Sequence, residues 1–273
     1  MKQPLLMGIL NATPDSFSDG GKFLSVDAAI KHGIQLMDEG ADIIDIGGES
    51  TRPKATPVAP DEEQHRVLPI IAELKSEAKK RGVKISIDTR NASTMREAVK
   101  AGADIINDVS ALTHDPDSVT FAAECDAQIV LMHMQGNPQT MQNNPTYKDV
   151  VQDVYNYLER RIDDCIMAGI QKSRLIADPG LGFGKTAEHS IALLNNARNF
   201  QTLGVPVLIG ASRKSFLAKL ANLADGEDRL QISLIAAVMA VEHGAQILRV
   251  HDVAETKEAL MIWQGLDRID NSH

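Results

Sequence analysis

The chain has 273 residues, of which 43% are hydrophobic, and its 37 acidic and 28 basic residues give a formal net charge of -9. This length and apolar content suffice for one sizeable core, so we expect a single domain over residues 1–273. The acidic balance argues against a protein whose whole surface binds nucleic acid or an anionic membrane, and an anionic substrate would need a local basic pocket.

The two cysteines, Cys125 and Cys165, each lie in a stretch that reads as helix, which supports neither a disulfide framework nor a CxxC metal site. The N-terminus offers only a short apolar run, and no apolar segment approaches the roughly 20 residues that a membrane span needs. We expect a soluble, cytoplasmic protein.

Short runs rich in Ile, Val and Leu alternate along the chain with longer amphipathic segments. Nearly continuous apolar runs of this kind indicate parallel strands that are covered on both faces. The eight runs are residues 5–10, 41–46, 83–88, 103–109, 128–134, 175–178, 205–209 and 246–250.

The segments between these runs have helical spacing, as at Ile30, Ile34 and Met37. Several end in a glycine before the next strand, at Gly40, Gly102 and Gly244, which suits the left-handed residue that terminates a helix. Eight such units predict the α/β class and a closed (β/α)₈ TIM barrel, because an open sheet would leave two edges to protect.

Every long irregular stretch follows a predicted strand. In a barrel these loops gather at one end, where active sites lie, so they indicate a substantial ligand. The stretches are residues 12–24, 47–60, 135–147, 179–189 and 211–229.

Polar side chains stand where the apolar strands end. Taken singly, Asp108 could cap the next helix, Asp45 could pair with a buried lysine, and His133 could be a core histidine. Their convergence on one rim instead favours a site for a flat heterocycle with a phosphate group. Asp178 would accept its N–H groups, and Arg249 with His251 would bind phosphate oxygens. The set is Asn11, Asp45, Glu49, Asp88, Asn107, Asp108, His133, Asp178, residues 212–214, and residues 249–252.

Three other kinds of site are poorly supported. Residues 178–186 end like a nucleotide P-loop but have Pro179 where the first glycine is required. Residues 210–214 have Lys214 where a nucleophile elbow needs glycine. The eight histidines form no HExxH motif and no zinc-like cluster.

Seven segments in order resemble the signatures of one family. Residues 7–21, MGILNATPDSFSDGG, and residues 45–53, DIGGESTRP, are similar to the first two signatures of the dihydropteroate synthases. The likeness runs from Met7 to about Leu260. The other matching segments are residues 86–89, 106–110, 178–186, 212–216 and 249–252.

The resemblance implies a homodimeric barrel enzyme that uses Mg²⁺ and acts on small molecules. It would condense 6-hydroxymethyl-7,8-dihydropterin diphosphate with p-aminobenzoate, giving 7,8-dihydropteroate and pyrophosphate in folate biosynthesis, and enzymes of this kind are sulfonamide targets. Asn11 would help coordinate Mg²⁺. The catalytic residues would be Asp88, Lys214, Arg249 and His251.

The resemblance also implies three groups of substrate contacts. The pterin would be bound by Asp88, Asn107, Asp178 and Lys214, and the diphosphate by Thr51, Arg249 and His251. Asp19 would join Asp88 near the developing positive charge. The aminobenzoate pocket would be built from Phe17, Ser18, Thr51, Arg52, Pro53, Phe183, Arg213, Lys214 and Ser215.

The chain departs from the family pattern at four positions, Ala12, Lys54, Ala111 and Ile232, none of which is assigned to a substrate. Lys54 stands where glycine is common, so it restricts the backbone of the second loop. Two other interpretations remain open. A pterin-binding methyltransferase would share the ring contacts but gives no reason for residues 51–53 and 212–215. A paralogue could also keep the barrel and bind a pterin or a partner without catalysis.

Overall fold

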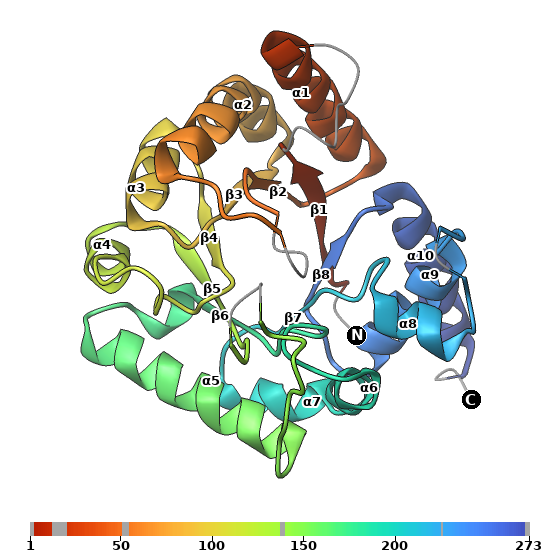
Figure 1. Cartoon of the computed structure of the whole chain (residues 1–273). Coiled ribbons are helices and arrows are strands. Elements are labelled where there is room, and N and C mark those ends of the chain that lie inside the picture. Colours follow the sequence, from red (N-terminus) through yellow and green to blue (C-terminus); the bar gives the residue numbers. More distant parts are fainter. Residues whose placement is uncertain (1–2, 13–20, 51–54, 137–139, 225, 271–273) are drawn as a thin grey trace.

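The computed structural model describes residues 3–12, 21–50, 55–136, 140–224 and 226–270. Eight parallel strands form a barrel inside a ring of helices (Figure 1), which confirms the predicted TIM barrel. Each predicted strand is present, with ends that differ by a few residues. The strands are β1 (Leu5–Asn11), β2 (Ile43–Gly47), β3 (Lys84–Asp88), β4 (Ile105–Asp108), β5 (Gln128–Met132), β6 (Leu175–Asp178), β7 (Leu208–Ile209) and β8 (Ile247–Val250).

The sheet order is β6-β5-β4-β3-β2-β1-β8-β7, so β6 and β7 are the two strands that must meet to close the barrel. They do so through one isolated parallel bridge between Ala177 and Val207. β7 is shorter than the predicted run over residues 205–209, because only Leu208 and Ile209 pair continuously with β8.

Helices follow the strands and cover the outside of the barrel (Figure 1). The glycines predicted to end helices have positive φ angles, +99° at Gly40, +125° at Gly102 and +101° at Gly244. The helices are α1 (Gly21–Glu39), α2 (Pro60–Arg81), α3 (Ala92–Ala101), α4 (Ser118–Glu124), α5 (Val150–Met167), α6 (Ala187–Asn195), α7 (Ala197–Phe200), α8 (Ser215–Leu220), α9 (Leu230–Glu242) and α10 (Val253–Asp270).

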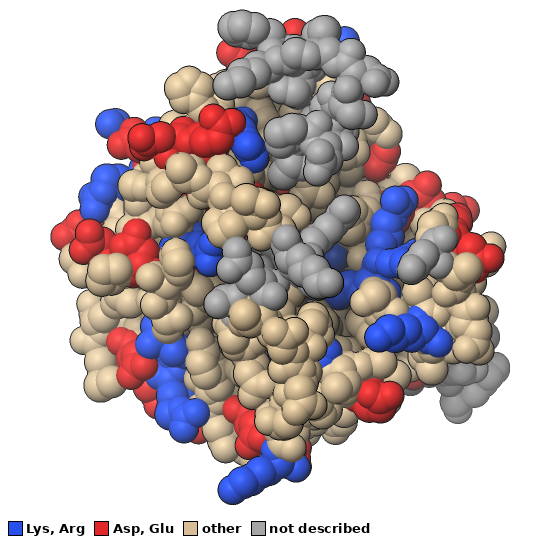
Figure 2. Space-filling model, in the orientation of Figure 1, with Lys and Arg blue, Asp and Glu red and all other residues tan. Residues whose placement is uncertain are grey.

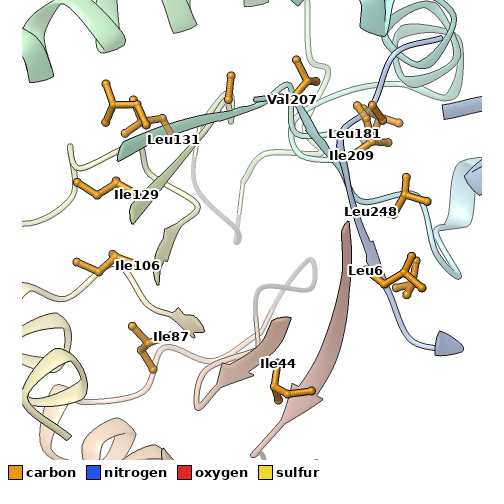
Figure 3. Close-up of a cluster of buried hydrophobic side chains, with 14 of the residues drawn as sticks. Leu6, Ile44, Ile87, Ile106, Ile129, Leu131, Leu181, Val207, Ile209 and Leu248 are labelled. Atoms are coloured by element: carbon orange, nitrogen blue, oxygen red, sulfur yellow. The ribbon is translucent and has the colours of Figure 1, made fainter. Parts of the chain in front are cut away.

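The core has two layers because strand side chains alternate between faces. Side chains such as Ile44, Ile87 and Leu248 point outward from the strands toward the helices (Figure 3). A separate cluster of seven buried side chains lies on the opposite face of the strands and fills the interior of the barrel. This apolar plug consists of Met7, Ile43, Ile105, Val130, Ile176, Leu208 and Ile247.

The plug determines which residues point into the barrel nearer its carboxyl end. Asp45, Asn107, Asp178 and Arg249 each follow a plug residue by two positions, so they share its inward face. The barrel interior is therefore apolar where the plug lies and polar nearer the carboxyl ends of the strands.

Both cysteines have free thiols. Cys165 is buried in α5, and burial raises the pKa of its thiol to about 11. Cys125 follows the last residue of α4, so its predicted place inside a helix was wrong by one position. Among the described residues, no helix combines the length and the apolar character that crossing a membrane requires.

Candidate active site

The polar residues predicted at the strand ends gather at the carboxyl end of the barrel. Four of them are buried: Asp88 and Asp178 end β3 and β6, Asn107 is the next-to-last residue of β4, and Asp45 lies in the middle of β2. Seen from the face in Figure 2, lysine and arginine side chains cluster beside the rim over β8 and α8. A chain with a net charge of -9 thus has a local basic region at this rim.

Arg249 links two carboxylates across the barrel. Its Nε donates to Asp45 Oδ2 at 2.6 Å and a terminal nitrogen donates to Asp88 Oδ2 at 2.8 Å. Asn107 Nδ2 donates to the same Asp45 oxygen at 3.0 Å. Asp45, which is fully buried, therefore pairs with an arginine and not with a lysine.

The protonation of this cluster is set by burial and by opposite charges. Burial raises the pKa of Asp88 to about 8, and the positive charge of Arg249 opposes that shift. Burial also works against the charged form of Arg249, but Asp45 and Asp88 raise its pKa, so the guanidinium stays positive. The cluster combines a fixed cation with a carboxylate that can exchange a proton near neutral pH.

Asp178 lies between two lysines on the other side of the barrel mouth. Its Oδ1 accepts the backbone N–H of Gly180 at 2.7 Å. Burial raises the pKa of Asp178, whereas Lys214, the Gly180 N–H and Lys185 lower it. A buried carboxylate with positive neighbours suits recognition of paired N–H donors.

Lys214 is held by the loop that follows β6. Its Nζ donates to the Leu181 carbonyl and lies 4.5 Å from the centre of the Phe183 ring. Burial lowers the pKa of Lys214 to about 8, although the charge of Asp178 acts in the opposite direction. The predicted residues Asp178, Phe183 and Lys214 are thus brought together.

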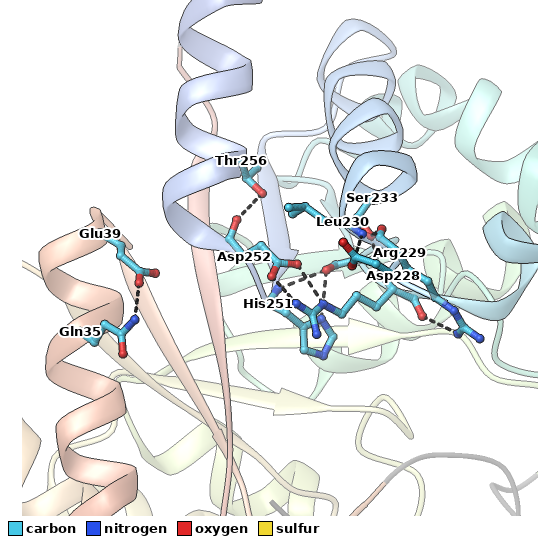
Figure 4. Close-up of polar contacts among 11 residues, drawn as sticks. Gln35, Glu39, Asp228, Arg229, Leu230, Ser233, His251, Asp252 and Thr256 are labelled. Carbon is cyan, nitrogen blue, oxygen red and sulfur yellow. Dashed lines mark hydrogen bonds and ion pairs between the residues drawn. The ribbon is translucent and has the colours of Figure 1, made fainter. Parts of the chain in front are cut away.

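The rim between β7 and β8 brings Ser212 and His251 together. His251 Nδ1 lies 3.0 Å from Ser212 Oγ, and that oxygen also accepts the His251 backbone N–H at 3.2 Å. Arg213 Nε donates to Asp252 at 3.0 Å, and Figure 4 shows Asp252 next to His251. Ser215 is the first residue of α8 and is exposed.

Several predicted site residues lie outside the described residues, namely Phe17, Ser18, Asp19, Thr51, Arg52, Pro53 and Lys54. The described flanks of the second loop are tied together by Glu49. This carboxylate accepts two hydrogen bonds from Arg90, at 3.0 and 3.1 Å, and one from the Val58 backbone N–H at 3.2 Å. Asn11, the predicted Mg²⁺ ligand, is the last residue of β1, paired in register with Gly47.

Two strand-end residues have structural partners. Asp108 accepts the backbone N–H groups of Ser110 and Leu112, at 2.7 and 2.8 Å, so it shapes the loop after β4 and does not cap α4. In that loop Ala111 has a φ of +54°, which explains why glycine suits this position. His133 is buried, and its ring stacks edge-on against Tyr157.

Sequence reasoning missed Lys185 and Glu63. Lys185 is only 3% exposed, and although it lies in a segment that resembles the family, it was given no role; a lysine within a glycine-rich apolar loop was a usable signal. Glu63 is fully buried in α2 and accepts hydrogen bonds from Thr89, Asn91 and Thr94. Nothing in the sequence separates Glu63 from its acidic neighbours in the first turn of α2.

A depression of about 550 Å³ lies at the opposite end of the barrel, between the ends of α1 and α2, with Arg81 and Lys257 in its wall. It faces the amino ends of the strands, where a barrel has its stabilising loops, so we place the candidate site at the other end. Among the described residues, no group of three or more His, Cys, Asp or Glu side chains could hold a metal ion.

Comparison with known proteins agrees with this geometry. A family model described as pterin binding enzyme matches residues 7–251. The dihydropteroate synthase of Haemophilus influenzae is 47% identical over 262 residues, covering 96% of this chain and 94% of that protein.

Solved structures are also similar over nearly the whole chain. The dihydropteroate synthase of Xanthomonas albilineans with 4-aminobenzoic acid has a TM-score of 0.90 and 46% identity, covering 97% of this chain and 93% of that one. The same enzyme with 7,8-dihydropteroate has a TM-score of 0.87 and 43% identity, covering 97% and 94%. The Yersinia pestis enzyme with a sulfonamide drug has a TM-score of 0.89 and 43% identity, with the same coverage. The chain belongs to the pterin binding enzymes and, within them, to the dihydropteroate synthase family.

Proposed function

We propose that this chain condenses 6-hydroxymethyl-7,8-dihydropterin diphosphate with p-aminobenzoate to give 7,8-dihydropteroate and pyrophosphate, as a single-domain enzyme. The observation that supports this most is the set of inward-facing polar residues directly above the apolar plug. Asp88, Asn107, Asp178 and Arg249 combine acceptors, an amide and a cation at one depth. This is the donor and acceptor pattern that a pterin with a diphosphate requires.

The pterin ring would lie among Asp88, Asn107, Asp178 and Lys214. The Asp178 carboxylate would accept two N–H bonds from the amino-pyrimidinone edge, in the way that a carboxylate accepts from a guanidinium. Lys214, which has carbonyl and aromatic partners in the loop after β6, would donate to ring acceptors. Burial strengthens these contacts because little water competes for them.

The diphosphate would be bound by Arg249 and His251, with Thr51 from the second loop. Arg249 uses its Nε and one terminal nitrogen for Asp45 and Asp88, and its other terminal nitrogen has no partner among the described residues. The C–O bond to the diphosphate would break, leaving positive charge spread over the pterin and its CH₂ group. Arg249 and His251 would stabilise the negative charge that grows on the leaving pyrophosphate.

The aminobenzoate would lie between Phe183, Lys214, Arg213 and Ser215 on one side and Arg52 with Pro53 on the other. Its amine nitrogen would attack the CH₂ carbon, form the new C–N bond and release a proton. No covalent bond to the enzyme is needed. Asp88 would oppose the positive charge on the pterin in its carboxylate form, and Asp19 would assist.

Mg²⁺ would be coordinated by the amide oxygen of Asn11 together with diphosphate oxygens and water. Such a hard oxygen donor suits Mg²⁺, which usually retains several waters and binds through few protein groups plus substrate phosphates. The lack of a cluster of acidic or imidazole ligands among the described residues is compatible with that mode. When bound, Mg²⁺ would supply charge neutralisation to the diphosphate.

The partner of this chain would be a second copy. Large apolar side chains are exposed along neighbouring helices at the side of the barrel, and α9 packs against both α8 and α10. Exposed apolar surface of this kind marks protein interfaces. The side chains are Leu220 of α8, Ile235 and Met239 of α9, and Ile262 and Leu266 of α10. We place the homodimer in the cytoplasm, where two free thiols stay reduced.

The test is turnover by the purified chain. Incubation with the pterin diphosphate, p-aminobenzoate and Mg²⁺ should release pyrophosphate and dihydropteroate in equal amounts. Folded protein that binds the pterin without turnover would support a non-catalytic relative, and methyl transfer from a methylated pterin would support a methyltransferase. Either result would overturn the proposal.

A further inference from the structure

The ammonium group of Lys185 is enclosed at the end of the loop between β6 and α6. Its Nζ contacts His133 Nδ1 at 2.9 Å, the His133 carbonyl oxygen at 3.2 Å and the Phe183 carbonyl oxygen at 2.9 Å. These three acceptors use all of the donors that an ammonium group has. Because none of them is a carboxylate, burying this charge is costly, and an apolar side chain would fill the space at less cost.

The loop that Lys185 secures lies directly on the backbone after β5. A Cβ atom added to Gly180 would come 2.0 Å from the His133 carbonyl oxygen, and one added to Gly184 would come 2.4 Å from that of Gln135. Both glycines have positive φ angles, +66° and +60°. The loop after β6 is therefore in close contact with the backbone after β5, and Lys185 donates hydrogen bonds to both segments.

This loop holds Lys214 in the candidate site. The Leu181 carbonyl accepts from Lys214, and the Phe183 ring lies 4.5 Å from the Lys214 ammonium. The bond from Lys185 to the Phe183 carbonyl fixes the backbone next to that ring. A shift of the loop would move both of the contacts that orient Lys214.

Burial lowers the pKa of Lys185 well below its ordinary value, whereas the charge of Asp178 raises it, and in its ammonium form Lys185 favours the Asp178 carboxylate. The groups that favour the Asp178 carboxylate are Lys214, the Gly180 N–H, Lys185 and Arg249, while burial favours its neutral form. Lys185 is the one of these charged groups to which the proposed mechanism gives no contact with a substrate. Its role would be indirect.

We propose that Lys185 is a positioning residue that orients the loop of Leu181 and Phe183 and, through this loop, Lys214 for pterin binding. The inference rests on the proposed function. It assigns a task to a buried lysine of the glycine-rich loop that contacts no substrate in the proposed function.

The test uses Lys185→Met, which keeps the side-chain length and removes the charge and all three donors. Pterin affinity at pH 7, measured by calorimetry on the whole chain, should fall at least about tenfold. The loss of affinity toward acidic pH should also begin at a higher pH than in the wild type, because Asp178 takes up a proton more readily once one of its three positive neighbours is removed. Lys79→Met, at an exposed lysine in the last turn of α2, should leave both measurements unchanged.

Lys185→Gln separates anchoring from charge, since an amide can still donate to the two carbonyl oxygens. It should recover thermal stability and part of the affinity, while its pH profile stays shifted. Wild-type affinity and an unshifted profile in Lys185→Met would overturn the proposal. Failure of both variants to fold would also overturn it, because Lys185 would then be required for the stability of the barrel. Failure of the proposed function would appear separately, as a wild-type chain without turnover.

Discussion

The Nε of Arg249 donates to Asp45 at 2.6 Å, although the two residues lie 204 positions apart in the chain. Asp45 has no exposed surface, and its second carboxylate oxygen has no hydrogen-bond partner among the described residues. The same Asp45 oxygen that binds Arg249 also accepts from Asn107. One buried carboxylate thus aligns a cation and an amide of the candidate site.

Replacing Asp45 with asparagine should destabilise the fold strongly. The change leaves the partly buried Arg249 with Asp88 as its only hydrogen-bonded carboxylate among the described residues, and breaking a pair whose carboxylate is fully buried costs about 3 kcal/mol or more. Urea denaturation measures the loss. Asp38→Asn is the matched control, because Asp38 pairs with Arg81 at the surface with 62% of its side chain exposed, and should cost less than about 1 kcal/mol. Similar losses in the two variants would contradict the alignment role.

Asp178→Asn should weaken pterin binding by on the order of 2 kcal/mol or more, because a charged acceptor is lost from a buried site. Isothermal calorimetry with the pterin diphosphate gives the affinity. An unchanged dissociation constant would remove Asp178 from the ring contact.

Arg249→Ala should reduce affinity for the diphosphate-bearing pterin and the rate of turnover much more than affinity for a pterin without the diphosphate. The reason is that the guanidinium would contact the leaving group and not the ring. Binding of both ligands is compared by calorimetry. An equal loss for the two would argue that Arg249 acts through Asp45 and Asp88 alone.

His133→Gln should show how a buried neutral histidine affects the pH dependence of the free energy of unfolding. Burial and the charge of Lys185 lower the pKa of His133 to about 3, whereas an unfolded histidine titrates near 6.5. The stabilising effect of this shift is complete above pH 6.5 and is lost as pH falls toward 3, because only the unfolded chain takes up the proton.

Between pH 7 and pH 5, the free energy of unfolding of the wild type should therefore fall by about 2 kcal/mol more than that of His133→Gln. Guanidinium denaturation at both pH values measures this difference. If the difference in unfolding free energy between the two proteins were the same at both pH values, His133 would titrate normally in the folded state.

Gly180→Ala should be far more damaging than Gly82→Ala, although the two glycines have nearly the same φ, +66° and +69°. A left-handed alanine costs about 1 kcal/mol at either position. Only at Gly180 does the new methyl group also meet a backbone oxygen, since nothing lies within 4 Å at Gly82. Thermal unfolding of the two variants compares them directly, and equal effects would be evidence against the close seating of the loop.

Much of the fold follows from local patterns that the sequence displays. Strand β6 was predicted over the residues that form it, and Gly40 was predicted to end a helix before β2. The partner of Asp45 was not predictable, because pairing between β2 and β8 side chains depends on how the barrel closes. Lys185 was missed for a related reason, since its acceptors at His133 become neighbours only when the loop after β6 packs on β5.

The apolar plug has a consequence for the order in which the two substrates bind. It fills the barrel on the side of the amino ends of the strands, so a ligand among Asp88, Asn107 and Asp178 has to enter from the carboxyl end, where Arg213 and Ser215 are exposed. The deeper ligand, the pterin diphosphate, should therefore bind before the aminobenzoate. Substrate inhibition by excess aminobenzoate, through premature occupation of the entrance, would be the kinetic signature of this arrangement.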